Sequence, residues 1–279
     1  MADLFHPPDG RSAGAAGRPV DRLVSLLKAL IPSKIGRYAD RLVASHAVIP
    51  ERTMRTMRLS EKLLPLPDDL LTDIVDDVFM RAKPGDIARA QFILSCVDIF
   101  SLSGMPQMRL LALYHRSISK GYATTAHIFM APSPKKIPYG EYDFVEGRDL
   151  DYLTLGEKRS LARTHTKDRL DRLLYDTNPL VVRNILENPS LTGPDVLKMA
   201  SRRPNHEQVL VTIYRSDRWV SSYDVKTAIV RNPYAPVPIA LGLMLFLKQQ
   251  DLSEIAADST LHDVIITTAR RLLSRRQAV

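Results

Sequence analysis

The segment around Trp219 holds the residue types best suited to bind a planar group. Trp219 follows Asp217 and Arg218 and is the only tryptophan in the 279-residue chain. An exposed indole beside a guanidinium can hold a nucleic-acid base or an aromatic side chain by stacking and cation–π attraction. The alternative is that Trp219 begins a helix and packs in the core between neighbouring helices, and this is the interpretation that we prefer.

Arginine recurs through the same region, once or twice in each predicted helical unit. If these side chains share one face, that face would attract an anionic partner. Arginine and tryptophan are also enriched among the residues that dominate protein–protein binding. The candidate partner-binding residues are therefore Arg183, Arg202, Arg203, Arg215, Arg218, Trp219 and Arg231.

The sequence holds no motif that predicts catalysis or a cofactor. None of the seven histidines has the spacing of a helical zinc site, and neither a P-loop nor a nucleophile elbow occurs. Adjacent carboxylates such as Asp76 and Asp77 point in different directions on a helix, so we expect solvated side chains. We predict no catalytic residue, no metal site, no cofactor and a protein that is not an enzyme.

Composition is that of a globular protein with a mild basic excess. The net charge is +8, and only Arg270, Arg271, Arg275 and Arg276 form a dense cluster. The single cysteine, Cys96, excludes an intrachain disulfide, and its apolar neighbours predict a buried helix. No secretory signal is recognisable, and the longest uncharged stretch, 232–247, is shorter than the roughly 20 residues that span a bilayer. We expect a buried helix there and a cytoplasmic protein.

Helical periodicity dominates the chain, and no stretch alternates as a β-strand would. Residues 20–130 predict five to seven helices, including one after Pro67 whose Asp73, Asp76 and Asp77 we expect to be exposed. Prolines and glycines break the pattern at 131–150. We expect an all-α chain with a disordered leader at 1–18, a helical N-terminal domain at 19–130, a linker at 131–150 and a repeat domain at 151–279.

A sequence pattern occurs twice in the C-terminal part. Residues 187–200 read ENPSLTGPDVLKMA, and residues 231–244 read RNPYAPVPIALGLM. Asn188-Pro189 thus matches Asn232-Pro233, 44 residues later, and an apolar pair precedes each copy. A period of this length, with two helices and two breaks, is typical of stacked helical repeats.

The Asn-Pro turn followed by an apolar helix resembles HEAT-like repeats, and more narrowly the leucine-rich repeat variant form found in bacterial proteins. The similarity covers residues 176–247 well and 154–278 loosely, and residues 258–273 have the helix without Asn-Pro. The N-terminal half resembles no family. The resemblance implies a short right-handed α-solenoid.

Such folds present surfaces to partners, so the leading hypothesis is a non-enzymatic scaffold that offers a solenoid groove to a protein partner. The alternative is nucleic-acid binding, in the manner of HEAT-like DNA glycosylases, with a basic face and an exposed Trp219. The sequence indicates neither the partner's identity nor the oligomeric state.

Overall fold

A computed structural model describes residues 34–83, 85–138, 150, 152–164, 167–277. Every regular element in this part of the chain is an α-helix, which confirms the all-α prediction. In the N-terminal half the helices are α2 (Lys34–Ala47), α3 (Arg52–Leu63), α4 (Asp68–Arg81), α5 (Ile87–Ser101), α6 (Gln107–Ser119) and α7 (Ala123–Phe129). In the C-terminal half they are α8 (Leu155–Leu161), α9 (Lys167–Leu173), α10 (Pro179–Glu187), α11 (Gly193–Ser201), α12 (Glu207–Arg215), α13 (Asp217–Val220), α14 (Tyr223–Val230), α15 (Val237–Met244), α16 (Gln249–Ala257) and α17 (Asp263–Gln277). The predicted leader lies outside the described residues.

Helix α5 is the centre of the N-terminal half. It is apolar on several sides, and α2, α3, α4 and α7 pack around it. Cys96 lies fully buried on this helix, as predicted, and burial raises the pKa of its thiol. The thiol therefore stays protonated and acts as a small apolar side chain.

The acidic side of α4 is more covered than its sequence predicted. Asp73 and Asp76 were expected to be exposed, but both are half-buried. Lys120 Nζ donates to Asp73 at 2.8 Å, and Thr125 Oγ1 donates to Asp76 at 2.8 Å. Asp77, also half-buried, pairs with Arg81 one turn later on the same helix. Lys120, which follows α6, and Thr125 of α7 thus cover the acidic face of α4. Each of the three carboxylates has a polar partner, as partly buried charged side chains usually do.

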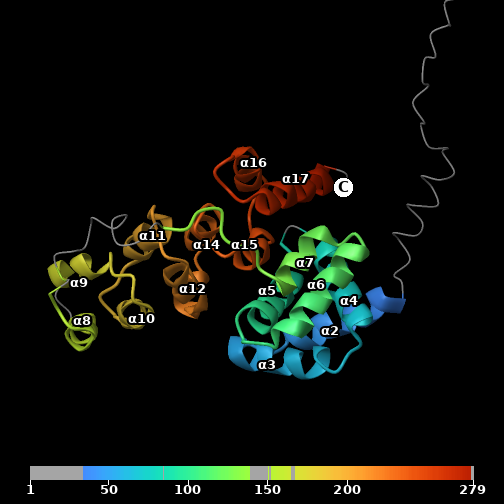
Figure 1. The fold of residues 1–279 in the computed structure, drawn as a ribbon, viewed down its shortest axis with the longest axis horizontal. Coiled ribbons are helices and arrows are strands. Elements are labelled where there is room, and N and C mark those ends of the chain that lie inside the picture. Colours follow the sequence, from blue (N-terminus) through green and yellow to red (C-terminus); the bar gives the residue numbers. More distant parts are fainter. Residues whose placement is uncertain (1–33, 84, 139–149, 151, 165–166, 278–279) are drawn as a thin grey trace, which may run out of the picture.

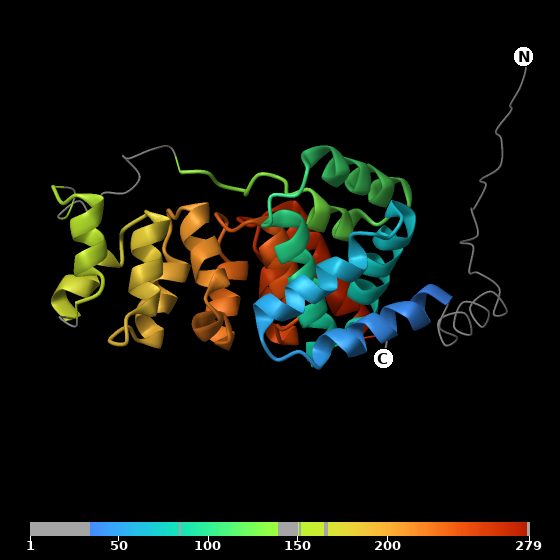
Figure 2. The ribbon, with the colours of Figure 1, turned by 90° about the horizontal axis from the view of Figure 1, so that it is seen from below.

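In the C-terminal half the helices stand in a row (Figures 1 and 2). Helix α10 packs between α8 and α12, while α11 packs against α12 and α14, and α14 against α15. Proline stands in the first turn of α10, α11 and α15, where its missing N–H leaves no helical hydrogen bond unmade. We call the row from α8 to α15 the helical stack.

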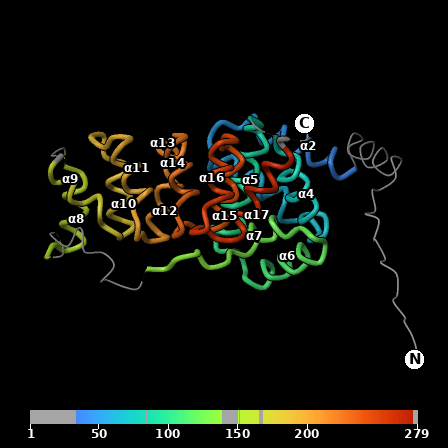
Figure 3. The backbone as a smooth tube through the Cα atoms, turned by 90° about the horizontal axis from the view of Figure 1, so that it is seen from above, coloured from blue at the N-terminus to red at the C-terminus, as the bar shows by residue number. Residues whose placement is uncertain are grey.

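The N-terminal half covers the end of the helical stack at which α15 lies. Helix α15 is buried at every residue and packs against α5, α7, α14 and α17, which confirms the predicted buried helix. A Cβ on Gly242 would lie 2.7 Å from Leu94 Cδ2 of α5, so glycine permits the close approach of the two helices. The buried apolar side chains of both halves form one continuous core. The first and last parts of the chain therefore meet, and α8 and α9 are left at the far end (Figure 3).

Residues 131–138 leave the N-terminal half and run without helix along the stack (Figure 2). Lys136 N donates to Pro233 O at 3.1 Å, and Lys135 Nζ lies 3.3 Å from Asp263 Oδ1. The described part of the predicted linker is thus attached to the C-terminal half that it crosses. The rest of that linker, except Leu150, is not described.

Candidate functional site

The first Asn-Pro turn joins two neighbouring units of the stack. The side-chain amide of Asn188 donates to Ala162 O at 2.7 Å and to Thr164 O at 2.8 Å, two carbonyls just beyond the end of α8. Its Oδ1 accepts from Ser190 N at 2.8 Å and closes the turn. Asn188 is buried. The residue therefore satisfies backbone carbonyls left unpaired at a helix end, which otherwise cost free energy when buried.

The second Asn-Pro turn makes the same bonds one unit later. Asn232 donates to Ala200 O at 2.8 Å and to Arg202 O at 3.0 Å, at the end of α11. Its Oδ1 accepts from Tyr234 N at 3.0 Å. The repeated sequence thus encodes a repeated contact between helical units, and its role is structural.

A third copy of the turn occurs at Asp258, where the sequence has no Asn-Pro. Asp258 N donates to Ile255 O, and Thr260 N donates to Asp258 Oδ1 at 2.9 Å. The turn geometry is kept because a carboxylate accepts as well as an amide oxygen does. The shared pattern is an Ile three residues before an Asn or Asp, and this pattern includes Asp258, which the Asn-Pro dipeptide does not.

Trp219 lies in the core between units, as the preferred interpretation of the sequence expected. Its side chain is 8% exposed, and its indole N–H donates to Leu186 O at 2.8 Å. Arg218 covers the ring, with its guanidinium carbon 4.2 Å from the ring centroid. The indole is therefore committed to contacts within the chain.

Several predicted arginines also bind the chain itself. Arg202 donates to Tyr175 O at 2.8 Å, and Arg215 donates to Leu102 O of the N-terminal half at 3.1 Å. Arg218 reaches Asn188 O and Leu191 O, both at 3.4 Å. Arg203 donates to Arg231 O, and Arg231 pairs with Asp251 and Glu254 of α16. Arg183, on α10, is exposed.

The two halves meet in a polar network that the sequence did not reveal. Arg52 of α3 makes two hydrogen bonds to Asp98 of α5, at 3.0 and 2.9 Å, and donates to Tyr214 O of α12 at 2.9 Å. Its guanidinium carbon lies 4.3 Å from the centroid of the Tyr214 ring. Tyr214 is fully buried and donates its hydroxyl to Asp98 at 2.9 Å. Burial raises the pKa of Tyr214, so its hydroxyl keeps the proton that it donates.

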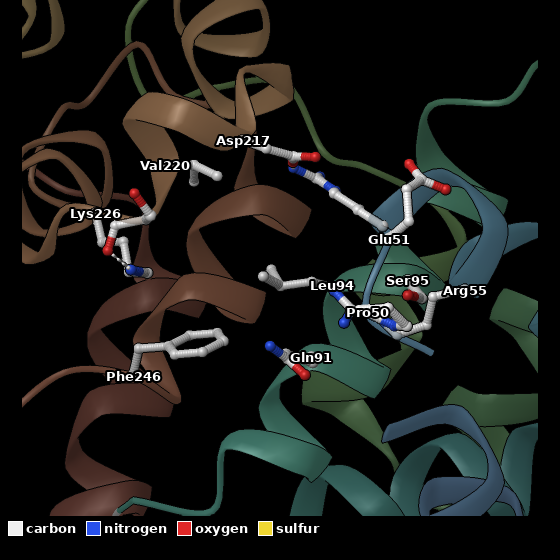
Figure 4. Close-up of a pocket in the computed structure, with 12 residues that line it drawn as sticks. Pro50, Glu51, Arg55, Gln91, Leu94, Ser95, Asp217, Val220, Lys226 and Phe246 are labelled. Carbon is white, nitrogen blue, oxygen red and sulfur yellow. Dashed lines mark hydrogen bonds and ion pairs between the residues drawn. The ribbon is translucent and has the colours of Figure 1, made fainter. Parts of the chain in front are cut away.

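A cavity of about 380 Å³ opens at the same junction. Its walls come from α3 and α5 on one side and from α13, α14 and the residues after α15 on the other (Figure 4). We call it the seam cavity. Arg55, Gln91 and Ser95 lie on the N-terminal wall, and Lys226 and Phe246 face them.

Ser95, which lines the seam cavity, is hydrogen-bonded to a histidine that does not. His46 Nε2 and Ser95 Oγ lie 2.9 Å apart in a hydrogen bond, and both residues are buried. Burial, with the positive charges of Arg55 and Lys62, lowers the pKa of His46 to about 4. His46 Nδ1 has no hydrogen-bond partner among the described residues. A general base needs a pKa near the working pH and a group that orients it, so the pair is poorly suited to activate Ser95.

No metal-binding group of histidine, cysteine and carboxylate side chains forms within the described ranges. None of the helices described there is both long and apolar enough to cross a bilayer.

Exposed apolar side chains lie at the far end of the stack and on the neighbouring helix α10. Tyr152 is 79% exposed, Leu155 on α8 is 41% exposed, and Leu180 on α10 is 40% exposed. Helix α8 packs against α10, and Arg183 lies one turn from Leu180 on the same side of α10. We call Tyr152, Leu155, Leu180 and Arg183 the far-end surface.

These features define an all-α protein whose stacked helical units carry one turn motif several times. No family model, no curated protein and no solved structure matches the chain.

Proposed function

We propose that this chain is a non-enzymatic protein-interaction module, built from helical repeats of the HEAT-like type, which binds a protein partner at the far-end surface. The observation that carries the proposal is the exposure of Tyr152 and Leu155 at the uncovered end of the stack, with Leu180 exposed on the next helix, α10. Terminal units of repeat proteins normally present a polar outer face, because exposed apolar area lowers solubility. Exposed apolar patches with a polar rim instead mark interaction sites.

The two ends of the stack support this proposal by contrast. At the covered end, Val211 and Tyr214 of α12 and all of α15 are buried. Toward the far end, Tyr152 and Leu155 are solvent-exposed, and so is Leu180 on α10. The proposed partner covers α8 and α10 as the N-terminal half covers α12 and α15. Arg183 is the member of the predicted set best placed to contact it, since its neighbour Leu180 supplies apolar area.

Nucleic-acid binding is the alternative, and the placement of its key residue weakens it. That hypothesis needs an exposed indole for base stacking, and Trp219 is buried. Arg202, Arg218 and Arg231 donate to, or pair with, groups of the chain itself. A filter-binding titration against salt tests the alternative, because phosphate contacts give a steep loss of affinity with salt.

Affinity capture from the source cells with matched variants tests the proposal. The double variant Leu155→Asp/Leu180→Asp places charge on the far-end surface, while Met108→Asp does the same at a 79% exposed residue of α6. We expect a protein retained by the wild type and Met108→Asp and lost from the double variant, with the circular dichroism of all three alike. Equal retention of every captured protein by all three forms would contradict the proposal.

A further inference from the structure

More cations than carboxylates line the seam cavity. The two carboxylates are those of Asp217 and Glu51. Asp217 accepts from Arg52 at 3.2 Å, and Glu51 accepts from Thr53 N at 2.8 Å and from Met54 N at the start of α3. Arg52 is in turn paired with Asp98.

Arg55 lines the seam cavity and forms no ion pair within the described residues. It is half-buried, and Nη1 donates to Ile49 O at 3.2 Å. Its Nε is buried without a hydrogen-bond partner among the described residues. An unpaired buried donor of a charged group costs free energy.

Lys226 lies on the opposite wall of the seam cavity. Its Nζ donates to Ser221 O at 2.6 Å and lies 5.3 Å from the centroid of the Phe246 ring. Within the described residues no carboxylate forms an ion pair with it. Partial burial lowers the pKa of Lys226, because it removes water from around the charge.

The surface between the two cations is partly apolar. Leu94, Val220 and Phe246 line it, with the Gln91 amide among them (Figure 4). A volume of about 380 Å³ lies within the roughly 300–1,000 Å³ of small-molecule sites.

We propose that the seam cavity binds a small organic dianion, with one acidic group at Arg55, the other at Lys226, and a short carbon chain against Leu94 and Phe246. The site lies away from the far-end surface and is independent of the proposed protein partner. Because its walls come from both halves, a bound dianion ties α3 and α5 to α14 and stabilises the folded chain by mass action.

Isothermal titration calorimetry of the full chain tests this with ligands of graded length and charge. The probes are succinate, glutarate and adipate, with inorganic phosphate as a second acidic chemistry, hexanoate as a monoanion and 1,6-hexanediol as the neutral analogue. We expect at least one dicarboxylate to bind at least tenfold more tightly than hexanoate and the diol. Equal binding of hexanoate, binding of inorganic phosphate alone, or no binding of any dicarboxylate at about 10 mM would overturn the proposal.

Variants locate the site. Lys226→Met and Arg55→Gln are each expected to weaken the best dicarboxylate at least tenfold, the equivalent of about 1.4 kcal/mol. Arg58→Gln is the control, because Arg58 lies one turn further along α3, is 59% exposed at its side chain and is not part of the cavity wall. If Arg55→Gln does not fold, Lys226→Met alone decides. Wild-type affinity in Lys226→Met would contradict the assignment.

Discussion

Asn188 and Asn232 stand 44 residues apart and make the same three hydrogen bonds. In each, the side-chain amide donates to two carbonyls at the end of another helix. The Oδ1 of each accepts from the backbone N–H of the residue two positions later in the chain. The repeated sequence is therefore a repeated joint between helical units. Surfaces that bind partners must lie elsewhere, where the units differ or end.

The contact made by Asn232 is expected to require an amide side chain at this position. Asn232→Asp cannot donate to Ala200 O or Arg202 O and buries a charge, so the free energy of unfolding should fall by about 2–4 kcal/mol. Asp258→Asn is the matched control, because an amide oxygen also accepts from Thr260 N, and its effect should stay within about 0.5 kcal/mol. Urea denaturation measures both. A small, equal effect of the two substitutions would show that the carbonyl contacts contribute little.

The junction of the halves should depend on the pairing of Arg52 with Asp98. Arg52→Met leaves the partly buried carboxylate of Asp98 without its cation and is expected to lower stability by about 2–4 kcal/mol. The double variant Arg52→Met/Asp98→Leu should lose less than the sum of the single variants, because it removes both charges. Arg58→Met, on the exposed side of α3, should change stability by under about 1 kcal/mol. Additive losses in the cycle would speak against a coupled pair.

Acid should destabilise the fold through His46. Burial and nearby cations lower the pKa of His46 to about 4 in the folded chain, against 6.5 for the free group. A lowered histidine pKa means that the folded state favours the neutral ring. The stabilisation is therefore complete above pH 6.5 and is lost as the pH falls toward 4.

Wild type should accordingly lose about 2–3 kcal/mol more than His46→Gln between pH 7 and pH 4, since one pKa unit corresponds to about 1.4 kcal/mol. Urea titrations of the two proteins at pH 7, 5.5 and 4 measure the difference, and the other titrating groups cancel in the comparison. Parallel pH profiles would contradict a desolvated His46.

The fluorescence of Trp219 should depend on the packing of the core and not on the binding of a partner. As the only tryptophan it gives an unambiguous fluorescence signal, and at 8% exposure it should resist acrylamide quenching until the chain unfolds. Trp219→Phe removes the donor to Leu186 O and should cost about 1–3 kcal/mol while partner capture persists. Native-state quenching as strong as in urea would place the indole at the surface.

The sequence predicted the features that depend on local pattern. Helical periodicity predicted the all-α fold, and apolar neighbours predicted a buried Cys96 and a buried helix at α15. These succeed because periodicity and burial are encoded within a few residues.

Features that join distant segments were not predictable in this way. Arg52 and Tyr214 are 162 residues apart, and only the folded chain shows that they touch. Asp73 and Asp76 were expected in solvent because α4 alone does not reveal that α6 and α7 cover it. The arginines were assigned to a partner because their carbonyl acceptors, such as Tyr175 O, carry no sequence signal.

Site-specific photocrosslinking in the source cells tests the central claim, a protein partner at the far-end surface. A photoreactive phenylalanine analogue replaces Leu180 in one protein and Met108, on the remote helix α6, in another. The proposal predicts a protein adduct at position 180 that is absent at position 108. No adduct at position 180, an adduct with nucleic acid there, or the same protein adduct at both positions would contradict it.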